Sequence, residues 1–236
     1  ISNKETIPLY QMLFEDGSNL GLSISYKVQH APNGIAESFI LGEEFIGKSA
    51  VSLILGDNIF YGKLNFFYDA VRDLKNGAVI FGYRVTDPER YGIVEFDKQG
   101  KVISIEEKPG NPKSDYAVPG LYVYDNKVVE ISKNLKPSKR GELEITDVNK
   151  VYMESNELSV KKIGRGVAWL DTGTPEALLQ ASNFFGVIEA RQGLKVACLE
   201  EIAFQKGFID KQGLEKLLTS MPNSLYKDYL LKLLKE

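Results

Sequence analysis

Short apolar strands alternate with amphipathic helices in the first third of the chain, and this alternation restricts the fold most strongly. Residues 50–55 form a short apolar run, typical of a strand that is buried on both faces of a parallel sheet. A helical pattern over 64–74 and an apolar strand pattern over 78–85 follow. Such alternation favours right-handed crossovers and ligand sites beyond the carboxyl ends of the strands. We therefore expect an α/β fold with a Rossmann-like, mixed but mostly parallel central sheet flanked by helices.

The rest of the chain predicts further strands, helices and one hairpin. Strict alternation over 20–28 predicts a strand, and a turn at 97–100 predicts a β-hairpin of 93–96 with 101–106. Thr174 and Pro175 indicate the start of a long helix that ends near Gln192. The remaining predictions are helices at 7–14, 34–45, 142–155, 214–218 and 225–234, and strands at 118–124, 158–162 and 167–169. We expect a core domain over 1–192 and a C-terminal helical appendage over 193–236.

Composition narrows the classes of function. A net charge of -3 disfavours binding to nucleic acid through a basic face. One cysteine and one histidine exclude a disulfide framework and a zinc site of clustered His and Cys. No apolar run approaches the roughly 18 residues that suggest a membrane span. We expect a soluble protein, with the cytoplasm as the favoured compartment.

Two apolar strands each end in an aspartate. Asp57 follows the run 53–55 and Gly56, and Asp171 follows 167–170 with Gly173 two residues further on. Together these two carboxylates could hold one Mg²⁺, with phosphate oxygens and water as the other ligands. Taken singly, each has a structural alternative, because Asp57 suits a turn and Asp171 suits the capping of the next helix.

Two cations stand where they could contact a phosphate. Lys108 precedes Pro109, which should hold it in an extended conformation with its ammonium directed at a phosphate, while Glu107 accepts sugar hydroxyls. If the strand continues that far, Glu106 and Glu107 point to opposite faces. Arg140, ahead of the helix at 142–155, could make a bidentate phosphate contact. The alternative in both cases is ordinary solvated surface charge.

Residues 29–34 could form a binding site for a nucleobase. The amide of Gln29 can pair with a donor and an acceptor on a base edge, and Gly34 lets a flat ring approach the backbone. Asn33-Gly34 is also a common turn pair, so the segment proves nothing by itself.

Five blocks resemble the glucose-1-phosphate thymidylyltransferases, within the sugar nucleotidylyltransferase family. The resemblance covers essentially the whole chain, and the blocks occur in the order that the family has. They are LGDNIFYG at 55–62, DPERYG at 87–92, EEKP at 106–109, RGELEITD at 140–147 and WLDTG at 169–173.

This resemblance implies that glucose 1-phosphate attacks the α-phosphorus of dTTP, giving dTDP-glucose and pyrophosphate without a covalent intermediate. It implies that Asp57 and Asp171 hold Mg²⁺, and that Lys108 and Arg140 contact the sugar phosphate. It also implies that Gln29 and Gly34 receive thymine. The positions that match the glucose pocket are Tyr91, Gly92, Glu107, Val118, Gly120 and Tyr122, and Trp169 is a further substrate-binding position.

The sequence departs from the family at its beginning. Family members start with a strand, a Gly-x-Gly-Thr-Arg loop and a catalytic lysine, and none of these occurs here. We therefore expect a further segment ahead of Ile1, which turnover would require.

The resemblance also implies a homotetramer and a second, regulatory site for a nucleotide sugar such as dTDP-rhamnose. Positions that match this site are Tyr61, Gly62, Arg165, Glu201 and Ile202. Gln205 stands where an arginine is common, which would weaken phosphate binding there.

Three alternatives remain open. The nearest is a transferase that uses UTP or ATP, because its metal ligands and sugar pocket would look much the same. A non-catalytic subunit or fragment that binds nucleotide sugars is the second. A retaining glycosyltransferase is the third, and the absence of an Asp-x-Asp motif speaks against it.

Overall fold

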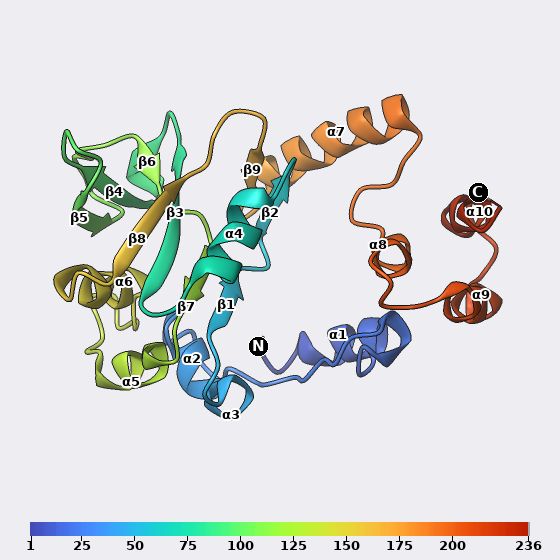
Figure 1. Ribbon diagram of the computed structural model, residues 1–236, viewed down its shortest axis with the longest axis horizontal. Coiled ribbons are helices and arrows are strands. Elements are labelled where there is room, and N and C mark those ends of the chain that lie inside the picture. Colours follow the sequence, from blue (N-terminus) through green and yellow to red (C-terminus); the bar gives the residue numbers. More distant parts are fainter. Residues whose placement is uncertain (236) are drawn as a thin grey trace. The chain divides into compact units, whose positions relative to one another are not determined.

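The computed structural model describes residues 1–235, which pack as two compact units (Figure 1). One unit is continuous and runs from Ala31 to Ser182. The other combines Ile1–His30 with Asn183–Glu236. These compact units do not test the domain boundary predicted between residues 192 and 193, which stays a prediction.

The unit 31–182 holds the strands and most of the helices that cover them. Its helices are α2 (Glu37–Leu41), α3 (Glu43–Ile46), α4 (Asn65–Asp73), η2 (Pro88–Arg90), α5 (Lys127–Asn134), α6 (Ile145–Glu154) and the start of α7 (Pro175–Gln192). Its strands are β1 (Val51–Ile54), β2 (Asn58–Tyr61), β3 (Ala78–Arg84), β4 (Gly92–Phe96), β5 (Val102–Glu107), β6 (Tyr116–Ala117), β7 (Leu121–Tyr124), β8 (Leu158–Lys162) and β9 (Ala168–Asp171).

The central sheet is mixed, and most of its pairings are antiparallel. Its strand order is β1-β7-β3-β6-β4-β5, with β8 beside β3. Only the β3–β8 ladder is parallel among the described strands. The α/β class is confirmed, but the expectation of a mostly parallel sheet was wrong. Strand β7 lies between β1 and β3 and runs antiparallel to both, so these two strands share a direction without being neighbours.

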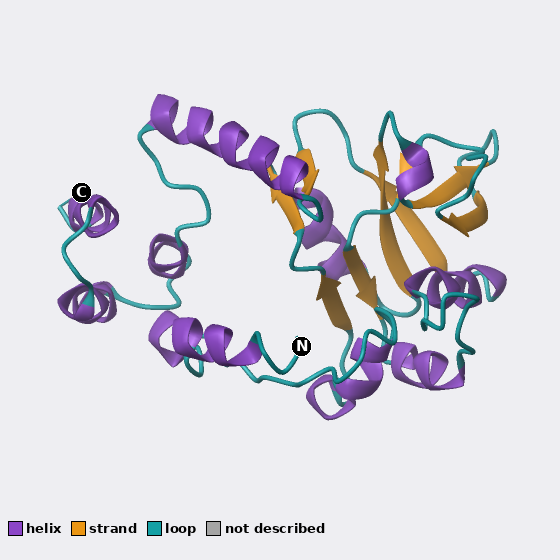
Figure 2. Ribbon diagram, turned by 180° about the vertical axis from the view of Figure 1, so that it is seen from behind, coloured by secondary structure: helices purple, strands orange, loops and turns teal. Residues whose placement is uncertain are grey.

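Helices cover both faces of this sheet, as Figure 2 shows for the helices around the orange strands. Alternate residues of β3 point to opposite layers. Ala78 and Ile80 pack in the cluster that contains residues of α2, α3, α5 and α6. Val79 and Phe81 pack in the cluster that contains Ala70 of α4. The continuous apolar sequence of β3 therefore reflects burial on both faces of the sheet.

Two predicted strands differ from the structure in instructive ways. β1 is not buried on both faces, because its residues alternate between half-buried and exposed. Residues 20–28 do not form the predicted strand, since their described pairing is a single parallel bridge between Ser2 and Val28. The alternation there still marks burial, with Ile24, Tyr26 and Val28 half-buried. Alternating apolar residues show that one side of the segment packs against the protein. A β-strand also needs a partner strand to pair with.

The second unit is helical. Its elements are α1 (Ile7–Phe14), η1 (Ser18–Leu20), the end of α7, α8 (Leu199–Gln205), α9 (Lys211–Ser220) and α10 (Leu225–Leu233). Cys198, Leu214, Leu218 and Leu230 form its buried core. The predicted helices at 7–14, 214–218 and 225–234 are confirmed, whereas α8 was not anticipated. Within the described residues, no helix combines the length and the apolar character that crossing a membrane requires.

Candidate active site

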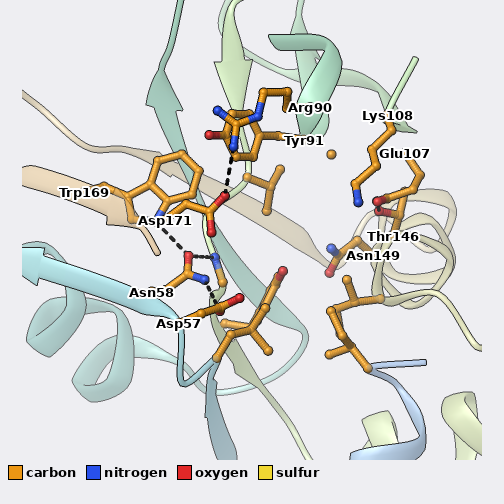
Figure 3. Close-up of a pocket in the computed structure, with 17 residues that line it drawn as sticks. Asp57, Asn58, Arg90, Tyr91, Glu107, Lys108, Thr146, Asn149, Trp169 and Asp171 are labelled. Atoms are coloured by element: carbon orange, nitrogen blue, oxygen red, sulfur yellow. Dashed lines mark hydrogen bonds and ion pairs between the residues drawn. The ribbon is translucent and has the colours of Figure 1, made fainter. Parts of the chain in front are cut away.

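One pocket of the unit 31–182, with a volume of about 230 Å³, gathers most of the predicted site residues (Figure 3). It lies where the ends of β1, β5 and β9 meet the start of α6. Its lining residues are Ile35, Leu55, Asp57, Asn58, Arg90, Tyr91, Gly92, Glu107, Lys108, Val118, Gly120, Tyr122, Ile145, Thr146, Asn149, Trp169 and Asp171.

The two predicted metal ligands lie together on one side of this pocket. The β2–β9 ribbon pairs Asn58 with Asp171, so it sets Asp57 next to Asp171 although more than a hundred residues separate them. The Thr172 N–H and hydroxyl both donate to the carbonyl of Asp57, at 2.8 Å each. A Cβ on Gly173 would lie 3.2 Å from Asp171 Oδ1 and 3.6 Å from Asp57 Oδ2. Glycine at this position therefore keeps the space between the carboxylates open.

Arg90 supplies positive charge beside Asp171. Its guanidinium donates to Asp87 at 2.8 Å and lies 3.8 Å from Asp171 Oδ2. Its guanidinium carbon also lies 5.3 Å from the centre of the Tyr91 ring. The hydrogen bond to Asp87 is the main cause that raises the pKa of Arg90 above its ordinary value. This arginine therefore stays charged at the rim of the carboxylate pair.

Glu107 and Lys108 line the pocket across from the two aspartates, as Figure 3 shows. The Thr146 hydroxyl donates to Glu107 Oε2 at 2.5 Å, which fixes the direction of that carboxylate. Its neighbour Glu106 instead pairs with Lys113 at 2.9 Å. The two glutamates thus have the separate surroundings that strand alternation predicts.

Lys108 does not have the extended conformation expected of a residue before proline. Its φ is +40°, in the left-handed region that residues other than glycine rarely adopt. Its backbone N–H donates to the carbonyl of Tyr91 at 3.1 Å, which continues the β4–β5 ladder by one residue. The ladder bond and the turn into Pro109 together fix this conformation. Strained backbone of this kind is often found at functional sites.

Aromatic side chains form part of the pocket wall. The Trp169 ring centre lies 5.1 Å from that of Tyr91 and 5.5 Å from that of Tyr83. Tyr122 is buried, and its burial raises the pKa of its phenol well above the ordinary value. Flat apolar faces beside hydroxyl-binding polar groups are suited to a sugar ring.

The structure brings together ten of the predicted site residues. They are Asp57, Asp171, Lys108, Tyr91, Gly92, Glu107, Val118, Gly120, Tyr122 and Trp169. All ten line one pocket, and their predicted roles stay predictions.

Arg140 does not line this pocket in the structure. Its guanidinium donates to both carboxylate oxygens of Glu144, at 3.1 and 2.9 Å, and to Glu142 at 3.2 Å. Ser138 donates to the same Glu144 carboxylate at 2.7 Å. Its role as a phosphate contact stays a prediction, and a phosphate would have to compete with Glu144.

The two residues predicted to bind the nucleobase belong to different compact units. Gly34 has a φ of +106°, and a Cβ there would lie 2.3 Å from the carbonyl oxygen of Leu143. Close packing of two backbone segments therefore accounts for this glycine. Gln29 belongs to the other compact unit, so its contact with a base stays a prediction.

The predicted regulatory residues fall into two groups. Tyr61 ends β2, and a Cβ on Gly62 would lie 2.5 Å from the carbonyl oxygen of Gly166, so the loop that contains Arg165 is adjacent. Glu201 and Ile202 belong to α8 in the other unit. Glu201 accepts hydrogen bonds from Tyr229 at 2.6 Å and from Gln205 at 2.9 Å. The regulatory role stays a prediction.

Several lining residues were not predicted as site residues. Asn58, Arg90 and Thr146 stand inside the quoted motifs, where their polar side chains could have been noticed. Thr146 and Asn149 are three residues apart on α6, so they share one helix face. Ile35 and Leu55 are ordinary apolar residues, and nothing in the sequence marks them as part of a pocket.

The carboxylate pair suits a hard divalent cation. Mg²⁺ is usually held by one or two carboxylates, with water and substrate phosphates as its other ligands. Asp57 and Asp171 leave open space between them at Gly173 and expose oxygen atoms to the pocket. No cluster of three or more His, Cys, Asp or Glu that could hold a metal occurs among residues 1–235. Asp57 and Asp171 are the carboxylates of this pocket that could hold such a cation together.

Comparison with known proteins shows which enzymes this chain resembles. Over 230 residues the chain is 51% identical to the glucose-1-phosphate thymidylyltransferase of Neisseria meningitidis serogroup A, covering 96% of this chain and 79% of that protein. It is 48% identical over 235 residues to the enzyme of the same name from Mycobacterium tuberculosis, covering 99% of this chain and 81% of that protein.

A solved structure extends the similarity to the fold. A Bacillus anthracis protein described as a glucose-1-phosphate thymidylyltransferase superposes with a TM-score of 0.71 at 40% identity, covering 77% of this chain and 73% of that one. A UDP-glucose pyrophosphorylase shares the fold at a TM-score of 0.62 and 23% identity. The nucleotidyl transferase family model matches residues 1–201. The chain therefore belongs to the nucleotidyl transferase family.

Proposed function

We propose that this protein is a glucose-1-phosphate thymidylyltransferase, which makes dTDP-glucose and pyrophosphate from dTTP and glucose 1-phosphate. The observation that carries the proposal is the pocket itself. It holds a pair of carboxylates on one side and a glutamate and a lysine on the other. These residues come from three motifs that lie far apart in the chain. Relatives that are about half identical carry the same name over nearly the whole chain.

The proposed reaction is an in-line displacement at phosphorus. An oxygen of the sugar phosphate forms a bond to the α-phosphorus of dTTP. The bond from that phosphorus to the oxygen that joins it to the β-phosphorus breaks, and pyrophosphate leaves with this oxygen. Positioning and electrostatics provide most of the rate acceleration in such reactions. Lys108 supplies positive charge for the sugar phosphate, and Glu107 accepts hydrogen bonds from sugar hydroxyls. Trp169 and Tyr91 provide apolar faces for the ring.

Mg²⁺ is part of the proposal. Asp57 and Asp171 would hold it, and when bound it would offset charge on the triphosphate and the departing pyrophosphate. The open space beside Gly173 and the paired carboxylate oxygens support this assignment.

The experiment is a pyrophosphate-release assay with dTTP, UTP and ATP, each with and without glucose 1-phosphate. The proposal expects release that needs both magnesium and the sugar phosphate, with dTTP having the highest kcat/KM. Preference for UTP would replace the nucleotide assignment. Tight binding of dTDP-glucose in isothermal titration without any turnover would favour a non-catalytic binding protein and contradict the proposal.

Assembly and regulation are further parts of the proposal. Exposed apolar residues on α7, including Leu178, Leu179 and Val187, support a homotetramer because subunit contacts usually cover such residues. Inhibition by dTDP-rhamnose and a place in dTDP-rhamnose synthesis follow from the same family resemblance.

A further inference from the structure

Asn58 connects three separate segments at the edge of the pocket. Its Oδ1 accepts hydrogen bonds from the Gly120 N–H at 2.9 Å and from the Trp169 indole N–H at 2.7 Å. Its Nδ2 donates to Asp57 Oδ1 at 2.8 Å. Figure 3 shows this chain of contacts running from Trp169 through Asn58 to Asp57.

The two donors determine which way the amide faces. Backbone N–H and indole N–H groups can only donate, so the side-chain atom that meets both must be the amide oxygen. The amide nitrogen then has to point toward the Asp57 carboxylate. The hydrogen-bond partners therefore distinguish the amide oxygen from the amide nitrogen and fix the orientation of this side chain.

Close packing holds the amide in place. A Cβ on Gly120 would lie only 2.8 Å from Asn58 Cγ and 2.7 Å from the Leu55 side chain. Gly120 itself is buried, and Asn58 and Trp169 are half-buried. Asp57, by contrast, is exposed. The packed amide therefore lies directly beside an exposed carboxylate.

We propose that Asn58 is a positioning residue, which orients the Asp57 carboxylate toward Asp171 for a divalent cation. The donor bond to Oδ1 leaves Oδ2 directed to the space beside Gly173, where Asp171 Oδ1 also lies. Hydrogen bonds of this kind to a ligating carboxylate typically change metal affinity about 10- to 100-fold. This inference rests on the proposed role of Asp57 as a metal ligand.

The test measures the affinity of the free protein for Mn²⁺ by electron paramagnetic resonance, without nucleotide or sugar. Asn58→Ala should weaken Mn²⁺ binding about tenfold. Trp169→Phe removes only one of the two donors that hold the amide, so it should weaken binding about twofold to threefold. Circular dichroism and thermal unfolding establish that each variant is folded. If Asn58→Ala does not fold, Trp169→Phe decides, and unchanged Mn²⁺ affinity in that variant overturns the inference.

A double-mutant cycle separates positioning from other roles. Asp57→Asn alone should weaken Mn²⁺ binding, and adding Asn58→Ala to it should cause no further loss. Unchanged affinity in Asp57→Asn would contradict the proposed metal site itself. Weakened affinity in Asp57→Asn with wild-type affinity in Asn58→Ala would leave that site standing and overturn the positioning role. An equal loss from Asn58→Ala in both backgrounds would also overturn it.

Discussion

Glu106 and Glu107 are adjacent residues with different surroundings. Glu107 lines the pocket and accepts from Thr146, while Glu106 pairs with Lys113 outside it. If Glu107 binds sugar hydroxyls, Glu107→Gln weakens a charge-assisted hydrogen bond. We expect KM for glucose 1-phosphate to rise about 10-fold or more, from the roughly 1.5–3 kcal/mol of such a bond. Steady-state kinetics with varied glucose 1-phosphate measures it.

Glu106→Gln is the matched control for this change. It removes the same charge one residue away, so any general effect of the charge appears in both variants. A similar rise of KM in both, or in neither, would contradict the assignment of Glu107 to the sugar.

Glu144 gives a prediction on pH. Burial raises the pKa of its carboxyl, but the hydrogen bonds from Arg140 and Ser138 and the charges of Arg140 and Lys108 together outweigh burial. The pKa therefore lies below its ordinary value of 4.5. A carboxyl with a lowered pKa in the folded state stabilises the fold above its unfolded pKa. This stabilisation is lost as the pH falls below 4.5 and through the folded-state pKa.

Glu144→Gln should therefore lower the free energy of unfolding at pH 7 by about 1 kcal/mol, the size of a partly exposed ion pair. The difference from the wild type should shrink toward zero as the pH falls below 4.5. Urea unfolding at pH 7 and at pH 3 measures both values. A difference that stays constant across this range would show that the Arg140–Glu144 contact does not provide the stabilisation.

Lys108 shows what single-residue rules can and cannot predict. The motif named this lysine as a site residue, and in the structure it lines the pocket. The rule for residues before proline predicted an extended backbone, whereas the ladder bond to Tyr91 holds φ at +40°. The local preference for an extended backbone before proline is therefore overridden by a tertiary contact that the sequence does not show.

Two glycines at the element scale have room for a Cβ but differ in backbone conformation. Gly186 lies inside α7 and Gly207 follows α8, and a Cβ at either would meet open space. Only Gly207 has a positive φ, of +72°.

Gly186→Ala should raise the free energy of unfolding by about 0.5–1 kcal/mol, because glycine weakens a helix interior. Gly207→Ala should lower it by about 1 kcal/mol, because the left-handed conformation is costly for alanine. Denaturant unfolding of both variants provides the comparison. The helix assignment would be contradicted if Gly186→Ala were the destabilising one.

The elements of the sheet were predictable, but their pairing was not. Periodicity located β3, β4, β5, β8 and β9 to within about two residues. It could not show that β7 inserts between β1 and β3, because a central strand covered by helices on both faces has the same apolar composition in either direction. The short strand β2 and the helix α5 were missed for lack of a distinct pattern of their own.

At the scale of the whole molecule, the site depends on segments brought together from positions 35 to 171 of the sequence. Motif order predicted the two aspartates, the glutamate and the lysine as one site, and they line one pocket. Sequence reasoning missed Asn58 and Arg90 because their contacts reach distant residues: Asn58 accepts from Gly120 and Trp169, and Arg90 lies beside Asp171.

The central claim is that Asp171 and Asp57 together form the catalytic metal site of a thymidylyltransferase. The most direct test compares turnover of Asp171→Asn with that of Asp69→Asn, a partly exposed aspartate on α4 that pairs with Arg72. Removing a carboxylate that contacts the catalytic cation should reduce kcat at least about 100-fold, while circular dichroism and thermal unfolding stay near wild type. Asp69→Asn should keep wild-type activity. Magnesium-dependent turnover that is unchanged in a folded Asp171→Asn variant would contradict the claim.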